Sequence, residues 1–75
     1  MYASMIPNGF LYNVALSNGH LVAKELTNRV ADRLCERLNR VSGGLESATE
    51  RGDVRDFANL IDRASEIVGV TAAAA

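Results

Sequence analysis

Cysteine and histidine are almost missing from this sequence of 75 residues. The single cysteine, Cys35, cannot close a disulfide within the chain, and one histidine, His20, provides no Cys/His cluster of the kind that holds zinc. We therefore expect no metal and no other cofactor. Chains of this size commonly depend on disulfides, a metal or another subunit for stability, and of these only self-association is left.

An excess of charge of one sign is also lacking, since 8 Lys and Arg residues oppose 9 Asp and Glu residues and the net charge is −1. A chain so balanced has no general positive field for the phosphates of nucleic acids or for anionic lipids. Aromatic residues make up only 5%, without tryptophan, which leaves few platforms for single-stranded bases. Composition thus argues against nucleic acid as a partner, although a local basic strip could still bind it.

No signal-peptide or membrane-spanning pattern is found in the sequence. The uncharged stretch Met1–Val22 is interrupted by Pro7, Gly9 and Gly19, which do not fit an apolar helix that crosses a bilayer. We expect a soluble, cytoplasmic protein that does not interact with membranes.

The length sets a physical limit on stability. Residues 1–75 are too few for more than one small domain, and surface scaling gives a folded area of about 4,500 Å² against about 11,700 Å² unfolded. Only about 60% of the chain's surface is then buried, which predicts a stability that another subunit would have to support.

Alternation of apolar and polar residues over 10–17 predicts a β-strand. The Asn18-Gly19 dipeptide that follows is favoured at tight type I′ turns, so residues 10–25 are expected to form a β-hairpin. A two-residue turn pairs Leu16 with Leu21 and Val14 with Ala23. In this register Val22 points to water. The side chains on the core face are Tyr12, Val14, Leu16, Leu21 and Ala23. The alternative is a short helix over 10–17, which gives an all-α helical hairpin.

After the hairpin the apolar period changes to three or four residues. One apolar stripe predicts a helix over 26–42, and it consists of Ala23, Leu26, Val30, Leu34, Leu38 and Val41. Gly43-Gly44 is expected to end this helix, because glycine readily adopts the left-handed conformation of a C-cap. A short helical turn over 45–51 and a second helix over 53–68, with Asp53 as its N-cap, complete the prediction.

The predicted fold is α+β, a small N-terminal β-hairpin followed by two antiparallel α-helices that cover one face of the ribbon. Residues 1–9 are interpreted as an N-terminal arm whose apolar part, residues 1–6, could lie on a neighbouring subunit, and residues 70–75 as a tail. Because two strands alone form a marginal sheet with exposed edges, we expect a homodimer joined through hairpin edges or apolar helix faces.

Four arginines of the first helix are the one patterned charge feature, here called the arginine rail: Arg29, Arg33, Arg37 and Arg40. At about 100° per residue they fall within about 80° of one another. One interpretation is a site for an acidic partner or for nucleic acid, because guanidinium groups bind carboxylates and phosphates. The other is structural, with the arginines covering the edge of the core and pairing with Glu36, Asp32 or acids of the second helix.

No combination of residues predicts catalysis or a metal site. The acids of the second helix are explained by its first turn and its polar face: Asp53, Asp56, Asp62 and Glu66. A nucleophilic Cys35 would need a base, but His20 lies beside the predicted turn and not on the same helix. We expect Cys35 to be a small buried side chain.

We therefore predict a small non-enzymatic module that binds another protein as an adaptor, an inhibitor or an assembly factor. Its expected contact surface is the arginine rail together with the hairpin residues Tyr12, Val14 and Leu16, and an acidic protein is the expected partner. The alternative is a dimeric nucleic-acid-binding protein that uses the arginine rail. In its order of a strand and two helices the chain resembles ribbon-helix-helix DNA-binding dimers, but its first helix is longer and its strand carries no basic pattern.

Overall fold

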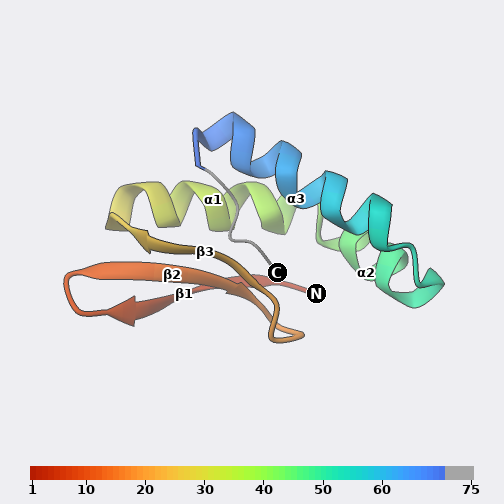
Figure 1. Ribbon diagram of the computed structural model, residues 1–75, viewed down its shortest axis with the longest axis horizontal. Coiled ribbons are helices and arrows are strands. Elements are labelled where there is room, and N and C mark those ends of the chain that lie inside the picture. Colours follow the sequence, from red (N-terminus) through yellow and green to blue (C-terminus); the bar gives the residue numbers. More distant parts are fainter. Residues whose placement is uncertain (71–75) are drawn as a thin grey trace.

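The structure is a computed structural model that describes residues 1–70. These residues fold into a three-stranded antiparallel sheet followed by three helices. The elements are β1 (Ala3–Asn8), β2 (Leu11–Leu16), β3 (Leu21–Leu26), α1 (Asn28–Arg40), α2 (Ser42–Arg51) and α3 (Val54–Val68). The strands lie in the order β1-β2-β3 (Figure 1). The predicted α+β class is confirmed, and the all-α alternative is wrong.

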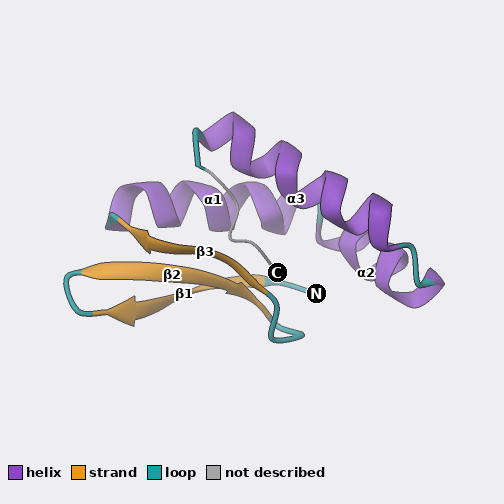
Figure 2. Ribbon diagram, viewed as in Figure 1, coloured by secondary structure: helices purple, strands orange, loops and turns teal. Residues whose placement is uncertain are grey.

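All three helices lie on one side of the sheet (Figure 2). Helix α1 contacts β1 and β2, while α3 runs antiparallel to α1 and contacts both α1 and α2. The two predicted antiparallel helices are therefore α1 and α3. No helix of residues 1–70 lies on the other face of the sheet (Figure 2).

The N-terminal segment is a strand and not an arm. Strand β1 pairs with β2 along its whole length, from Ala3 opposite Leu16 to Asn8 opposite Leu11. The turn between the strands places Gly9 at its first position with φ +66°, a conformation that glycine adopts without strain. Residues 3–8 of the predicted arm thus complete the sheet of their own chain, which corrects the interpretation of residues 1–6 as a segment that lies on a neighbouring subunit. The third strand also removes the likeness in element order to ribbon-helix-helix dimers.

The predicted β2–β3 hairpin is confirmed, but its register is not. Residues 17–19 form a three-residue loop, in which the Gly19 N–H donates to the Leu16 carbonyl and the Leu16 N–H donates to the His20 carbonyl, both at 2.9 Å. Ala15 therefore lies opposite Leu21, and a register shift restores the predicted pair of Val14 and Ala23.

This register shift changes which side chains of β3 reach the core. Val22, which the prediction turned to water, is fully buried, whereas Leu21 pairs with Ala15 on the uncovered face. A second shift follows, at which Glu25 has φ +58° and its N–H donates to Asn13 Oδ1 at 3.1 Å. The side chain of Asn13 supplies the partner that the irregular backbone at Glu25 needs.

One apolar core lies between the sheet and the helices. Its largest fully buried side chains come from both layers: Val14, Val22, Leu34, Leu38 and Leu45. Helix α1 begins after Thr27, whose side chain accepts the Val30 N–H. The first two residues of the predicted stripe, Ala23 and Leu26, therefore belong to β3 and not to the helix.

The Gly43-Gly44 pair lies inside a helix and does not end one. Helix α1 ends at Arg40, and after Val41 the ten-residue helix α2 begins at Ser42. The predicted short turn over 45–51 is therefore part of a full helix. A Cβ atom at Gly44 would lie 3.3 Å from a methyl group of Leu60 in α3. Gly44 thus serves the close approach of α2 to α3 and not a C-cap.

Both ends of α3 are as predicted. The Asp53 carboxylate accepts the Asp56 N–H at 3.0 Å, which is an N-cap contact. At the other end Gly69 has φ +82°, and the Val70 N–H donates to the Ser65 carbonyl at 2.8 Å, as in a Schellman motif. Of the predicted tail, residues 71–75 lie outside the described part of the chain.

Candidate functional site

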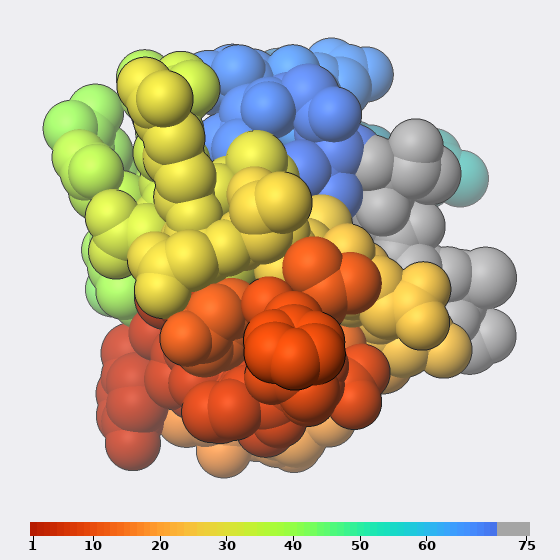
Figure 3. All heavy atoms as spheres, turned by 90° about the vertical axis from the view of Figure 1, so that its left-hand side faces the viewer, coloured from red at the N-terminus to blue at the C-terminus, as the bar shows by residue number. Residues whose placement is uncertain are grey.

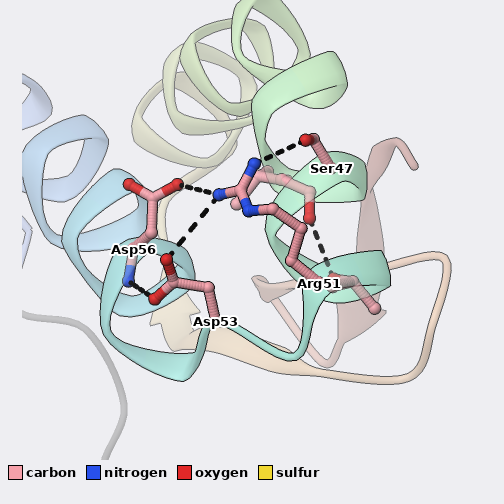
Figure 4. Close-up of polar contacts among 6 residues, drawn as sticks. Ser47, Arg51, Asp53 and Asp56 are labelled. Atoms are coloured by element: carbon pink, nitrogen blue, oxygen red, sulfur yellow. Dashed lines mark hydrogen bonds and ion pairs between the residues drawn. The ribbon is translucent and has the colours of Figure 1, made fainter.

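The carboxylates at the start of α3 belong to a structural cluster (Figure 4). The Arg51 guanidinium at the end of α2 donates to Asp56 Oδ2 at 3.0 Å and to Ser47 Oγ at 2.7 Å, and it lies 3.7 Å from Asp53 Oδ2. These contacts tie the end of α2 to the first turn of α3. Among residues 1–70, no three His, Cys, Asp or Glu side chains gather as a metal site would require.

Cys35 and His20 lie in different surroundings. Cys35 is buried at 8% exposure on α1, and burial, followed by the nearby Asp32 carboxylate, raises the pKa of its thiol. The His20 ring instead contacts the Phe57 ring of α3 edge to face, with centroids 5.3 Å apart. Each residue thus has a packing role. Cys35 is buried, as expected, and His20 is half-buried against α3.

The arginine rail follows the exposed side of α1. Arg29, Arg33 and Arg40 are exposed and Arg37 is half-buried. Only Arg40 makes an ion pair with another described residue, at 2.8 Å to Glu36 one turn before it. Seen from the end where β1 turns into β2, the first half of α1 lies beside the second half of α3, above the strands (Figure 3). The rail is therefore close to a second helix.

A groove of about 130 Å³ lies between these two helices, here called the arginine groove. Helix α1 contributes one turn of its surface: Arg37, Arg40 and the adjacent Val41. Helix α3 contributes residues at positions i, i+3, i+4 and i+7, which share one face: Leu60, Arg63, Ala64 and Ile67. The groove thus has apolar walls and is lined by arginines from both helices.

The charged residues that line the arginine groove are all positive. Neither Arg37 nor Arg63 makes an ion pair with any of residues 1–70, and the one carboxylate bound to Arg40 comes from Glu36, which does not line the groove. Ile67 is 50% exposed beside them, although isoleucine is usually buried. The groove therefore combines unneutralised positive charge with accessible apolar surface.

The contact surface predicted from the sequence did not include Arg63, so the part of this residue in the groove was missed. A signal was present, because Arg63 follows Leu60 by three residues and precedes Ile67 by four, which puts it at the edge of that apolar face. Only the packing of α3 against α1 brings this edge to the rail.

The three hairpin residues of the predicted contact surface point inward. Val14 and Leu16 are buried at 0% and 4% exposure, and Tyr12 is half-buried against the core. A partner could not reach Val14 or Leu16 without opening the fold, so we leave these residues out of the contact surface. The exposed apolar side chains near the strands are Tyr2, Ile6 and Phe10 instead.

A second cavity, of about 240 Å³, lies between the β2–β3 turn and the junction of α2 and α3. Asn18, Asp53 and Phe57 are among its lining residues. Asp53 is already engaged as the N-cap of α3, and Phe57 contacts His20. Because these polar and aromatic groups already have partners, this cavity is a weaker candidate than the arginine groove.

No family model matches the chain, and comparisons with curated proteins and with solved structures found no match either. Within the described residues, every helix is too short or too polar to cross a membrane.

Proposed function

We propose that this protein is a non-enzymatic interaction module that binds an acidic segment of another protein through the arginine groove. An adaptor, an inhibitor and an assembly factor would all act in this way. The observation that carries the proposal is a pair of arginines, Arg37 from α1 and Arg63 from α3, that line one apolar groove and make no ion pair with residues 1–70.

The chemistry of the groove supports a protein partner. Arginine is enriched in protein interfaces, where its planar group binds carboxylates and its methylene groups cover apolar surface. A partner that covers Ile67 would remove apolar area from water and would exclude water from the adjacent ion pairs, which strengthens them. The single free thiol of Cys35 is compatible with the reducing cytoplasm as the place of action.

The exposed sheet edges, which were one reason to expect a homodimer, are partly protected in the structure. On β1 the backbone groups that point away from β2 belong to Ala3, Met5 and Pro7. The side-chain amide of Asn39 binds the N–H and the carbonyl of Ala3, and Pro7 has no N–H to offer. Strand β3 has two register shifts, which also hinder pairing of edges. A homodimer stays a prediction, and sedimentation at micromolar concentration tests it: a stable monomer would contradict it.

Nucleic acid is the second candidate for the rail. Arg29, Arg33 and Arg37 follow one another at four-residue steps, and none makes an ion pair with residues 1–70. A shift of duplex DNA at low salt that is lost when Arg33 and Arg37 are changed to Glu would favour this candidate. We rank it second because the apolar groove beside the rail offers nothing to a phosphate backbone.

Co-purification with two matched variants tests the proposed function. Arg63→Glu reverses a charge in the groove, and Arg55→Glu makes the same change at an exposed position of α3 outside the groove. We expect a protein, identified by mass spectrometry, that binds the wild-type chain and Arg55→Glu but not Arg63→Glu. Calorimetry with that protein in purified form should give the same order. Binding that is equal for both variants would contradict the proposal.

A further inference from the structure

The size of the arginine groove limits what can enter it. Its volume is about 130 Å³, and an apolar cavity of about 150 Å³ in another protein is known to hold one benzene ring. Pockets for cofactors and drug-sized ligands are larger, roughly 300–1,000 Å³. The groove therefore matches one large apolar side chain in size and is smaller than the pockets that enclose cofactors.

Positively charged residues line this space from both helices. Arg37 and Arg40 belong to the wall formed by α1, and Arg63 belongs to the wall formed by α3. The rest of the lining is apolar and consists of Val41, Leu60, Ala64 and Ile67. A side chain placed in the groove would thus have arginines of both helices near it.

From these two observations we infer that the groove takes a linear peptide segment with one leucine- or phenylalanine-sized anchor and with Asp or Glu on both sides of that anchor. This inference rests on the proposed function and specifies its partner. The anchor buries apolar area in the centre, and each flanking carboxylate neutralises a guanidinium group at the rim. Buried anchors near the centre of an interface commonly contribute most of the binding energy, while its rim is polar.

A segment without the anchor would leave the apolar surface of Val41 and Leu60 exposed to water, and an apolar segment without acids would bury positive charges that have no partner. A carboxylate on one side only would neutralise one wall and leave the other. The geometry thus requires all three parts, which distinguishes the segment from a general polyanion.

Selection from a displayed library of random linear peptides on the immobilised full-length chain tests the inference. We expect the selected peptides to share one large apolar residue flanked by acids on both sides. Replacing the anchor by alanine, or the acids of one side by their amides, should weaken binding of a synthetic peptide about tenfold, which corresponds to about 1.4 kcal/mol.

Two pairs of variants show whether the selected peptide binds in the groove. Ile67→Ala and Arg63→Gln should each weaken binding, while Val54→Ala and Arg55→Gln, at exposed positions of the same helix outside the groove, should not. Thermal unfolding of all four variants shows whether the fold is intact. Equal binding by all four variants would overturn the inference.

The remaining outcomes separate this inference from the proposed function. Selected peptides that are acidic but have no apolar anchor would overturn the inference and leave an acidic partner in place. If no peptide is selected but a co-purified protein still needs Arg63 for binding, the inference is overturned and the proposed function is kept. Failure of both experiments, with duplex DNA bound through the rail, would overturn both proposals.

Discussion

The side-chain amide of Asn39 in α1 binds both backbone polar groups of Ala3, the first residue of strand β1. The Ala3 N–H donates to Asn39 Oδ1 at 2.7 Å, and Asn39 Nδ2 donates to the Ala3 carbonyl at 3.4 Å. These backbone groups point away from β2, so the amide takes the position that a further strand would take. One side chain of the helix layer thus closes the start of the sheet edge and holds β1 against α1.

Replacing Asn39 by alanine should lower the free energy of unfolding by about 1–2 kcal/mol, because the part-buried N–H and carbonyl of Ala3 lose their partners. Urea unfolding measures the loss, and hydrogen exchange at Ala3 should become faster. Asn59→Ala is the matched control, since Asn59 is exposed on α3 and makes no side-chain hydrogen bond with residues 1–70. Equal stability of the two variants would show that the amide contact contributes nothing.

The two neighbouring glycines of α2 should respond differently to alanine. A Cβ atom at Gly43 would meet no atom within 4 Å, and the helical backbone there suits alanine, so Gly43→Ala should stabilise the protein by about 0.5–1 kcal/mol. At Gly44 the Cβ atom would lie 3.3 Å from Leu60, which would have to move, so the gain should be smaller or absent. Thermal unfolding of the two variants decides, and a larger gain at Gly44 would contradict the close approach of α2 and α3.

The helices could be predicted from the sequence because their signals are local. The period of Leu34 and Leu38, the cap at Asp53 and the stop at Gly69 each depend on residues within one or two turns. Gly43-Gly44 was misread for the same reason, since the local signal of a glycine pair is a C-cap. The contact that explains Gly44 comes from Leu60, sixteen residues later.

Strand β1 and the register of β3 could not be predicted from local patterns. Pro7 argues against a strand unless its position faces away from the neighbouring strand, where no N–H is needed, and this depends on the pairing itself. The irregularity at Glu25 is stabilised by Asn13, twelve residues earlier. Both features depend on how the strands pair. The alternation of apolar and polar residues within one strand gives no information about this pairing.

The part of the candidate site that belongs to α1 could likewise be predicted from the sequence. The rail residues Arg37 and Arg40 share a side of α1 by periodicity alone. Arg63 and Ile67 join them only because α3 packs antiparallel beside α1. A pattern along one helix gives its faces, whereas the groove depends on the way two helices pack.

Removing the N-cap of α3 should destabilise the protein at the junction of α2 and α3. Asp53→Ala leaves the Asp56 N–H without its acceptor and weakens the contact to Arg51, at an expected cost of about 1 kcal/mol. Asp53→Asn keeps the cap and should recover most of the loss. Urea unfolding compares them with Asp62→Ala, a loss of the same charge at an exposed position of α3, which should change stability by less than about 0.5 kcal/mol. If Asp62→Ala costs as much as Asp53→Ala, the cap contributes nothing specific.

Burial of Cys35 should make the protein's stability depend on pH in the alkaline range. Because burial and the nearby Asp32 raise the pKa of its thiol in the folded state, the folded protein prefers the protonated thiol more than the unfolded chain does. This preference contributes to stability below the usual thiol pKa of about 8.5, and it is lost as the pH rises through the raised pKa.

The unfolding free energy of the wild-type chain should therefore fall more steeply above about pH 8.5 than that of Cys35→Ala, measured by urea unfolding at several pH values. All other titrating groups are common to the two proteins, so the difference between the two pH profiles reports the thiol alone. The absolute stability of the variant is not diagnostic, because loss of the buried sulfur also changes packing. Iodoacetamide should react slowly with the folded wild-type chain and quickly in urea. Parallel pH profiles together with fast labelling of the folded chain would show that Cys35 is accessible and that its thiol pKa is not raised.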